Sequence, residues 1–326
     1  MKLTEKEAIT LACIDLRASA PISLIQKESG LREHTIRHAL RSLLRRQVIS
    51  PVPFINLHRL GLTIYTIFFT VSGEKRGSHE ALIKALIAAP EIIWVGEFGG
   101  EFQYGIALAT KRFQDFALFM SEISKKHGSV FHDKAISIEI SFTMYPRRYL
   151  TSRKLSTNPI KATFDDREPV AIDQIDSRIL SAIATDGTIS HRQLSQRLNI
   201  PLSTMELRLR KLKQQGVIAG EIYGVDAAKF EIKTFKLLVY TKGLDGSLTD
   251  KIDQYCRLQP NITALIACVG SWGYEINVEV QHSEELSLII QQLYEFFGNS
   301  IHTIKTLTKF SYPKARFFVD LSVEKI

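Results

Sequence analysis

The chain has 326 residues, about two domains' worth at the usual ~150 residues per domain. Apolar residues make up 45% of it, a proportion that excludes a disordered chain and indicates real hydrophobic cores. The net charge of +8 at pH 7 is compatible with an anionic partner, although charge alone fixes no fold.

The N-terminus, MKLTEKEAIT, carries Glu5 and Glu7 where a signal peptide needs an apolar run. Nowhere does the chain reach the roughly 18 uncharged apolar residues that a membrane span requires. Cys13, Cys256 and Cys268 are odd in number and lack metal-ligand spacing, so we interpret them as reduced thiols. We therefore expect a cytoplasmic protein with no membrane partner.

Residues 1–55 are expected to form a first helix-turn-helix domain. Within them, PISLIQKESGLREHTIRHALRSLLRRQVI breaks its apolar pattern at Gly30 and resumes with Ile36, Leu40 and Leu43 on one helical face. A short helix, a tight turn and a second helix with a basic outer face are typical of a helix-turn-helix, whose second helix enters the major groove of DNA. The candidate DNA-binding residues here are Arg32, His34, Thr35, Arg37, His38, Arg41 and Arg45.

Residues 56–150 follow the order strand, helix, strand, strand, helix, strand. TIYTIFFTV opens this segment and AISIEISFTMYP closes it. Pro90 follows the first helix, Gly99 and Gly100 mark the central strand turn, and Gly128 ends the second helix. Helix ends and hairpin turns favour these residue types. The pattern predicts a β-α-β-β-α-β, ferredoxin-like domain.

A polar, aperiodic, proline-containing stretch, residues 151–171, reads as a linker between two halves. Residues 172–226 then repeat the helix-turn-helix pattern, with a break at Asn199–Pro201. The apolar face of its second helix consists of Met205, Leu209 and Leu212. The candidate DNA-binding residues of this copy are Ser203, Thr204, Arg208, Arg210 and Lys211.

Residues 227–326 repeat the sheet pattern, from KTFKLLVYT to IKTLTKFSYP. Pro260, Gly270 and Gly298 occupy the places of the proline and glycines in the first half. The chain is therefore expected to be a tandem duplication. Its predicted fold class is α+β, with two winged helix-turn-helix domains alternating with two β-α-β-β-α-β ferredoxin-like domains.

The simplest alternative for each basic helix is a solvated face with no partner, and for a lone helix we would favour it. Here each basic helix follows a short helix and a break, and the whole arrangement occurs twice. These features favour double-stranded DNA as the partner.

The second half resembles the Lrp/AsnC (feast/famine) family of transcription regulators. The resemblance rests on an ordered set of residues: Asp173, Asp176, Ile179, Leu180, Arg208, Leu212, Gly216, Val217 and Ile218. It implies that the sheet domains are of the RAM type, which sense small ligands and mediate oligomerisation. The first copy departs from the family pattern in having Ala39 where the second copy has Arg208.

The resemblance also implies an effector site near the central hairpins. Its candidate residues are Gly100, Gln103, Tyr104, Gly270, Trp272 and Gly273. Gln103 and Gly273 stand where family members often carry an aspartate, so the ammonium group of an amino-acid effector would lack a carboxylate partner. Trp94 and Trp272 could line a pocket, although aromatic residues in strands more often pack in a core or an interface.

An enzyme on the same scaffold is the second interpretation. Siroheme decarboxylases resemble this family and sometimes contain two fused copies. The candidates by residue type for such a site are Tyr104, Arg147, Arg148 and Tyr274. No histidine pair has metal spacing, so we expect no metal. The recognition helices keep a basic face that a decarboxylase would not require, so we favour the regulator and expect no cofactor and no enzyme activity.

In the resembling family, sheet domains of two chains pack together and bury their open faces. We therefore predict that residues 62–145 and 232–312 form a pseudo-two-fold pair within one chain, and that chains associate further into a homo-oligomer. Because the two recognition helices differ at nearly every exposed position, we also predict two unequal DNA-reading heads and an asymmetric DNA site.

Overall fold

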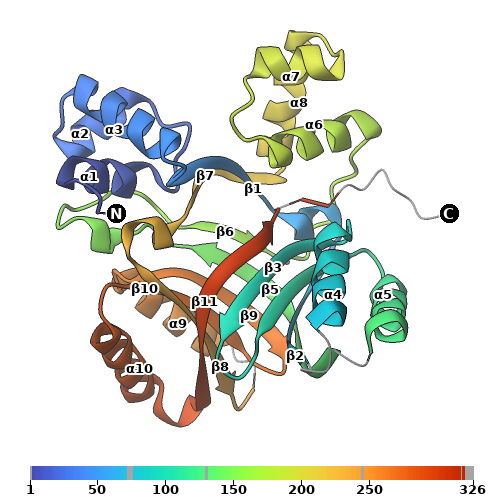
Figure 1. The fold of residues 1–326 in the computed structure, drawn as a ribbon. Coiled ribbons are helices and arrows are strands. Elements are labelled where there is room, and N and C mark those ends of the chain that lie inside the picture. The colour runs from blue at the N-terminus through green and yellow to red at the C-terminus, as the bar shows by residue number, and fades with distance from the viewer. Residues whose placement is uncertain (1, 72–75, 129–130, 244–245, 317, 320–326) are drawn as a thin grey trace.

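The computed structural model describes residues 2–71, 76–128, 131–243, 246–316 and 318–319. Figure 1 shows two small helical domains on one side of a large, curved β-sheet. Within the described part of the chain, no helix is long and apolar enough to cross a bilayer.

The first helical domain consists of α1 (Glu5–Ile14), α2 (Ile22–Ser29) and α3 (Glu33–Arg45). A capping box starts α1: Thr4 and Glu7 each accept, through the side chain, a hydrogen bond from the other's backbone N–H. Gly30 ends α2 in the left-handed conformation, at φ +64°, which glycine adopts without steric cost. The three helices share a core that includes Leu11, Ile25, Ile36 and Leu43.

The second helical domain consists of α6 (Gln174–Thr185), α7 (His191–Leu198) and α8 (Leu202–Gln214). Ser190 and Gln193 form the capping box of α7, and Asn199 ends that helix in the left-handed conformation, at φ 53°. Asparagine tolerates this conformation, so it takes the place that Gly30 has in the first copy. The core of this domain includes Ile179, Leu194, Met205, Leu209 and Leu212.

Each third helix leads into a wing strand. The wings are β1 (Ile49–Ile55) and β7 (Ile218–Val225). They pair with each other in antiparallel fashion, and the pairing joins the two helix-turn-helix domains. In Figure 1 this ribbon lies between the two helical domains, above the large sheet.

Each half continues into a ferredoxin-like domain of four strands and two helices. The first contains β2 (Thr63–Val71), α4 (Arg76–Ala88), β3 (Ile92–Gly99), β4 (Tyr104–Thr110), α5 (Phe113–His127) and β5 (Phe131–Met144). The second contains β8 (Lys233–Thr241), α9 (Gly246–Leu258), β9 (Ile262–Gly270), β10 (Tyr274–Val280), α10 (Ser283–Phe297) and β11 (Ile301–Ala315). Their strand orders, β5-β2-β4-β3 and β11-β8-β10-β9, are equivalent. The predicted fold class is confirmed.

The two sheets join along both edges, because β3 pairs with β11 and β5 pairs with β9. These pairings close a ring of eight antiparallel strands, a β-barrel built from one chain. The predicted pairing of the two sheet domains within the chain is confirmed. They meet through shared edge hydrogen bonds, so the predicted packing of two separate sheets face to face is wrong.

One face of each sheet points into the barrel. Phe68, Phe98, Phe102, Leu238, Cys268, Trp272 and Leu307 form the core at this inner side. The outer faces pack against the helices, α4 and α5 in the first half and α9 and α10 in the second. Closing the barrel therefore buries the faces that would otherwise lie open to water.

The interpretation of residues 151–171 as an aperiodic linker needs a correction. Within it, β6 (Ile160–Thr163) pairs with β5 and extends the large sheet beside the barrel. The linker is also fixed by Arg59, whose guanidinium donates to the carbonyls of Arg167 and Glu168 at 3.3 and 3.1 Å. This strand could not be predicted from the sequence, because it is only four residues long and pairs with a single neighbouring strand, β5.

Candidate functional site

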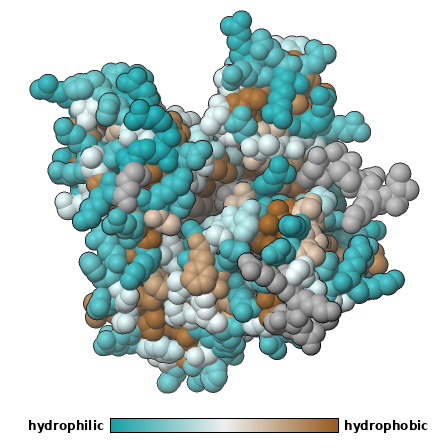
Figure 2. Space-filling model, viewed as in Figure 1, coloured by the Kyte–Doolittle hydropathy of each residue, from teal (hydrophilic) through white to brown (hydrophobic). Residues whose placement is uncertain are grey.

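Helix α3 presents a basic face to solvent. Ile36, Ala39 and Leu43 are buried under it. The predicted residues Arg32, His34, Arg37, His38, Arg41 and Arg45 are exposed, and Thr35 is half-buried. Figure 2 shows mostly hydrophilic side chains over both helical domains. All seven candidates therefore lie on α3 or at its N-cap, and six of them are exposed.

Helix α8 presents a weaker basic face. Ser203, Arg210 and Lys211 are exposed and Thr204 is half-buried. Leu207 is 62% exposed on the same helix. The neighbouring Glu206 is also exposed, so the accessible face mixes apolar, acidic and basic groups.

Arg208 differs from the other candidates because its guanidinium is already occupied. Its Nη1 lies 2.7 Å from Asp173 Oδ2 and 2.9 Å from Asp176 Oδ1, at the start of α6. The hydrogen bond from the Asp176 backbone and the Arg208 guanidinium together lower the pKa of Asp173. Arg208 therefore ties α8 to α6.

The first copy makes the equivalent tie from another position. Glu7 of α1 accepts hydrogen bonds from Ser42 and Arg46, each at 2.7 Å, at the end of α3. Ala39, the counterpart of Arg208, is buried. The two copies thus connect the recognition helix to the first helix through different residues, so the first copy makes this contact without an arginine at position 39.

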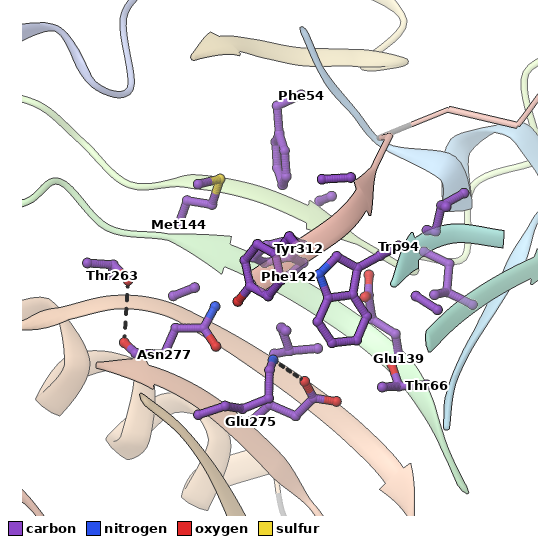
Figure 3. A pocket seen from close by; sticks show the side chains of 18 of the residues that line it. Phe54, Thr66, Trp94, Glu139, Phe142, Met144, Thr263, Glu275, Asn277 and Tyr312 are labelled. Carbon is purple, nitrogen blue, oxygen red and sulfur yellow. Dashed lines mark hydrogen bonds and ion pairs between the residues drawn. The ribbon is translucent and has the colours of Figure 1, made fainter. Parts of the chain in front are cut away.

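A second feature is a cavity of about 200 Å³ inside the barrel, at the end that faces the wing ribbon. Phe54 of β1 and Val225 of β7 contribute to its wall, as do strands from both sheet domains. The wall is largely apolar and includes Trp94 and Phe142 (Figure 3). Trp94 and Tyr312 meet edge to face with ring centroids 5.5 Å apart. The mouths of β-barrels commonly hold ligands.

The cavity wall also contains buried charges, most of them paired. Lys236 Nζ lies 2.5 Å from Glu275 Oε2, and His58 Nε2 lies 3.2 Å from Glu139 Oε1. The Trp272 indole N–H donates to the other oxygen of Glu275 at 3.2 Å. These carboxylates are therefore satisfied within the protein.

Arg147 forms the largest of these pairings. Its Nε and Nη2 donate to the two oxygens of Glu279 at 2.8 and 3.0 Å, and Tyr149 donates its hydroxyl to Glu279 at 2.5 Å. The backbone N–H of Arg147 donates to Asp15 at 2.9 Å. Burial raises the pKa of Asp15 to about 6, and the Arg147 cation opposes that rise. The network joins the first helix-turn-helix domain to both sheet domains.

Lys309 has no such partner. It lines the cavity from β11, and no carboxylate oxygen of a described residue lies within the 4.0 Å of an ion pair. Its Nζ lies 4.5 Å from the centre of the Tyr312 ring, and burial lowers its pKa. Nearby in the same wall, Asn277 Oδ1 is buried and accepts no hydrogen bond.

Residues 172–219 match the family model described as winged helix-turn-helix DNA-binding. The chain is 41% identical over 123 residues to an uncharacterized HTH-type transcriptional regulator of Pyrococcus horikoshii, covering 37% of this chain and 75% of that protein. It is 24% identical over 139 residues to the HTH-type transcriptional regulator FL11 of Pyrococcus furiosus, covering 42% and 89%. This similarity indicates the same family as the architecture, in which a winged helix-turn-helix domain precedes a ferredoxin-like domain. The chain belongs to the Lrp/AsnC family.

The whole duplicated fold of this Lrp/AsnC protein is also found in a solved enzyme. The crystal structure of the siroheme decarboxylase NirDL aligns with a TM-score of 0.58, over 96% of this chain and 93% of that one. The sequence identity is 14%, so the likeness is one of fold.

The predicted effector residues lie at or next to the central hairpins, and among them Trp272 reaches the cavity wall indirectly, through its bond to Glu275. Gly100 and Gly270 adopt φ +132° and +143° at the central hairpins, and Trp272 is buried in the barrel interior. Gln103 accepts from the backbone N–H of Val71 at 2.9 Å. Tyr104 and Gly273 are the remaining two, and none of the six lines the cavity. An effector site at the hairpins stays a prediction.

Of the four residues named for an enzyme site, one lines the cavity, namely Arg147. Arg148 donates to the carbonyl of Arg257 on the outside, and the Tyr274 hydroxyl bonds Thr249 at 2.8 Å. Sequence reasoning missed Lys236, Glu275 and Lys309. The available signal for Lys236 was a charged residue within the apolar run of β8, whereas Glu275 and Lys309 lie in strands with several polar residues and had no such signal. Among the described residues, no group of three or more His, Cys, Asp or Glu is placed to hold a metal ion.

Replacing Arg208 with alanine tests its assignment as a helix tie. We expect a loss of at most about 1 kcal/mol in the free energy of unfolding, because the pair with Asp173 is partly exposed. The salt dependence of DNA binding should stay unchanged, whereas Arg210→Ala should reduce that slope by about 0.9 if Arg210 contacts a phosphate. Thermal unfolding and DNA titrations at several salt concentrations measure both effects. A reduced slope for Arg208→Ala contradicts the assignment.

Proposed function

We propose that the protein is a sequence-specific, DNA-binding transcription regulator of the Lrp/AsnC type. The observation that carries the proposal is the exposed basic face of α3, the second helix of a helix-turn-helix. Its arginines offer contacts to phosphates and to guanine edges, and its histidines add further hydrogen-bond donors.

The arrangement of the two heads supports binding to one DNA molecule. Both helical domains lie on the same side of the barrel (Figure 1), and the β1–β7 ribbon connects them. Their exposed residues differ: Arg37, His38 and Arg41 of α3 correspond to Glu206, Leu207 and Arg210 of α8. A carboxylate repels phosphate, so α8 is the weaker head and the preferred DNA site is asymmetric.

Selection of bound fragments from the host's genomic DNA tests this proposal. We expect the full-length protein to enrich a motif with two unlike halves, since a symmetric site requires identical reading heads. A palindromic motif would contradict the unequal heads. No enriched motif at low or moderate salt would contradict sequence-specific DNA binding.

A siroheme-decarboxylase-like enzyme is the second candidate, favoured by the fold match over nearly the whole chain. Two observations weigh against it. The cavity of about 200 Å³ falls below the ~300–1,000 Å³ of sites for drug-sized ligands, and a tetrapyrrole is larger than most of those ligands. Arg147 is already bound to Glu279 and Asp15. A Soret band in the purified protein would favour the enzyme.

A further inference from the structure

The starting observation is a cation in the barrel cavity, Lys309, that forms no ion pair with a described carboxylate; the charges of Asp226 and Glu279 act on it only from a longer distance. The three glutamates in the cavity wall each bond another side chain: Glu139 to His58, Glu275 to Lys236 and Glu279 to Arg147. Lys309 is left with a ring contact to Tyr312. An unpaired ammonium in a largely apolar wall is stabilised by an anion from outside the chain.

The cavity also has an unused hydrogen-bond acceptor. Asn277 Oδ1 is buried and no described group donates to it. A buried acceptor without a donor is unfavourable, because it has lost its hydrogen bonds to water. A ligand hydroxyl would supply that donor, while a ligand carboxylate would pair with Lys309.

The size and lining of the cavity restrict the rest of the ligand. A cavity of about 150 Å³ lined by apolar side chains can hold benzene, so about 200 Å³ has room for one ring with a short acidic chain. Phe54, Trp94, Phe142 and Tyr312 contribute aromatic surface to the wall. Amino acids fit less well, because their ammonium group would find each glutamate of the wall already bonded.

We propose that the barrel cavity binds a small aromatic hydroxycarboxylate, with its carboxylate on Lys309 and its ring against the aromatic wall. Because Phe54 and Ile55 of β1 and Val225 of β7 line the same cavity, this ligand contacts both wings. Each wing strand follows a recognition helix directly in the chain. The ligand is therefore an effector that alters the relative placement of the two heads, a consequence that rests on the proposed DNA-binding function.

Calorimetry with the full-length protein tests the binding site without DNA. The probe is 4-hydroxyphenylacetate, compared with its neutral amide, with tyramine and with tyrosine. We expect the carboxylate to bind at least about tenfold more tightly than each of the other three, since a charge-assisted hydrogen bond contributes about 1.5–3 kcal/mol. Equal affinity for the carboxylate and the amide, or no binding of the carboxylate, would overturn the proposal.

Two variants of the same strand locate the anion. Lys309→Met should lower the affinity for 4-hydroxyphenylacetate to that of the amide. Lys305→Met should leave it unchanged, because Lys305 lies outside the cavity and pairs with Glu101 at 2.6 Å. An unchanged affinity in Lys309→Met overturns the placement. If Lys309→Met does not fold, the comparison of carboxylate and amide on the unaltered protein still decides the charge preference.

DNA titrations with and without 4-hydroxyphenylacetate test the effector role separately. The unaltered protein should change its DNA affinity when the ligand is present, and Lys309→Met should not. Calorimetric binding combined with unchanged DNA affinity would overturn the effector role and leave the site itself supported. Calorimetric binding by a protein that does not bind DNA would overturn the proposed function instead.

Discussion

Replacing both Arg37 and Arg41 with alanine should weaken DNA binding by at least about tenfold, since one bidentate arginine contact to guanine contributes about 1–3 kcal/mol. Both side chains are exposed on α3. The ion pair between Arg37 and Glu33 does not prevent Arg37 from contacting DNA, because both side chains are more than half exposed and exposed ion pairs are weak. Where the two arginines contact phosphates, the slope of log affinity against log salt should fall by about 1.8.

The matched control is Arg210→Ala with Lys211→Ala on α8. It removes the same charge from an exposed surface and avoids Arg208, which is tied to α6. We expect a smaller loss of affinity from this pair at the same salt concentration. An equal or larger loss would overturn the unequal heads. No loss from either pair would exclude DNA binding through these helices.

The helix-turn-helix domains were predictable because their pattern is local. Ile36, Leu43, Met205 and Leu212 recur at helical spacing and are buried as expected. Strand order within each sheet domain follows from the same kind of short-range signal, with turns marked by glycine. A resemblance to a family supplied the remainder, including the pairing of the two sheet domains.

The closure of the barrel and the presence of its cavity could not be predicted from local sequence patterns. Thr308 pairs with Gly99, and Ser137 pairs with Gly270. No local sequence feature of these four strands predicts which strand each one pairs with. The cavity wall comes from both wings and from strands of both halves, so its residues are far apart in sequence. The effector prediction fell on the central hairpins because the family resemblance implies a site there. The inward lysine at position 309 is conspicuous only once the strands are closed around it.

Replacing Arg147 with methionine should lower the free energy of unfolding by about 3–5 kcal/mol, because it leaves buried carboxylates without their cation. Arg147 is 7% exposed, and its guanidinium bonds Glu279 of β10 and lies 3.5 Å from Asp15 Oδ2 at the end of α1. Three parts of the molecule therefore lose a common contact. Thermal unfolding of the full-length protein should show a fall in Tm, and the first helix-turn-helix domain should be digested faster by protease.

The pH dependence of this loss separates charge from packing. Burial raises the pKa of Asp15 from 3.8 to about 6 even beside Arg147, so the folded state binds this proton more tightly than the unfolded state. Removing the cation raises that pKa further, and protonation at low pH then neutralises the buried charge. The loss in free energy of unfolding caused by Arg147→Met should therefore be smaller at pH 5 than at pH 8. Adding Glu279→Gln to the same chain should recover part of that loss.

The control is Arg148→Met, one residue along and outside the network. It should change the free energy of unfolding by less than about 0.5 kcal/mol. If Arg147→Met loses the same free energy of unfolding at both pH values, the cause is lost packing and not an unpaired carboxylate.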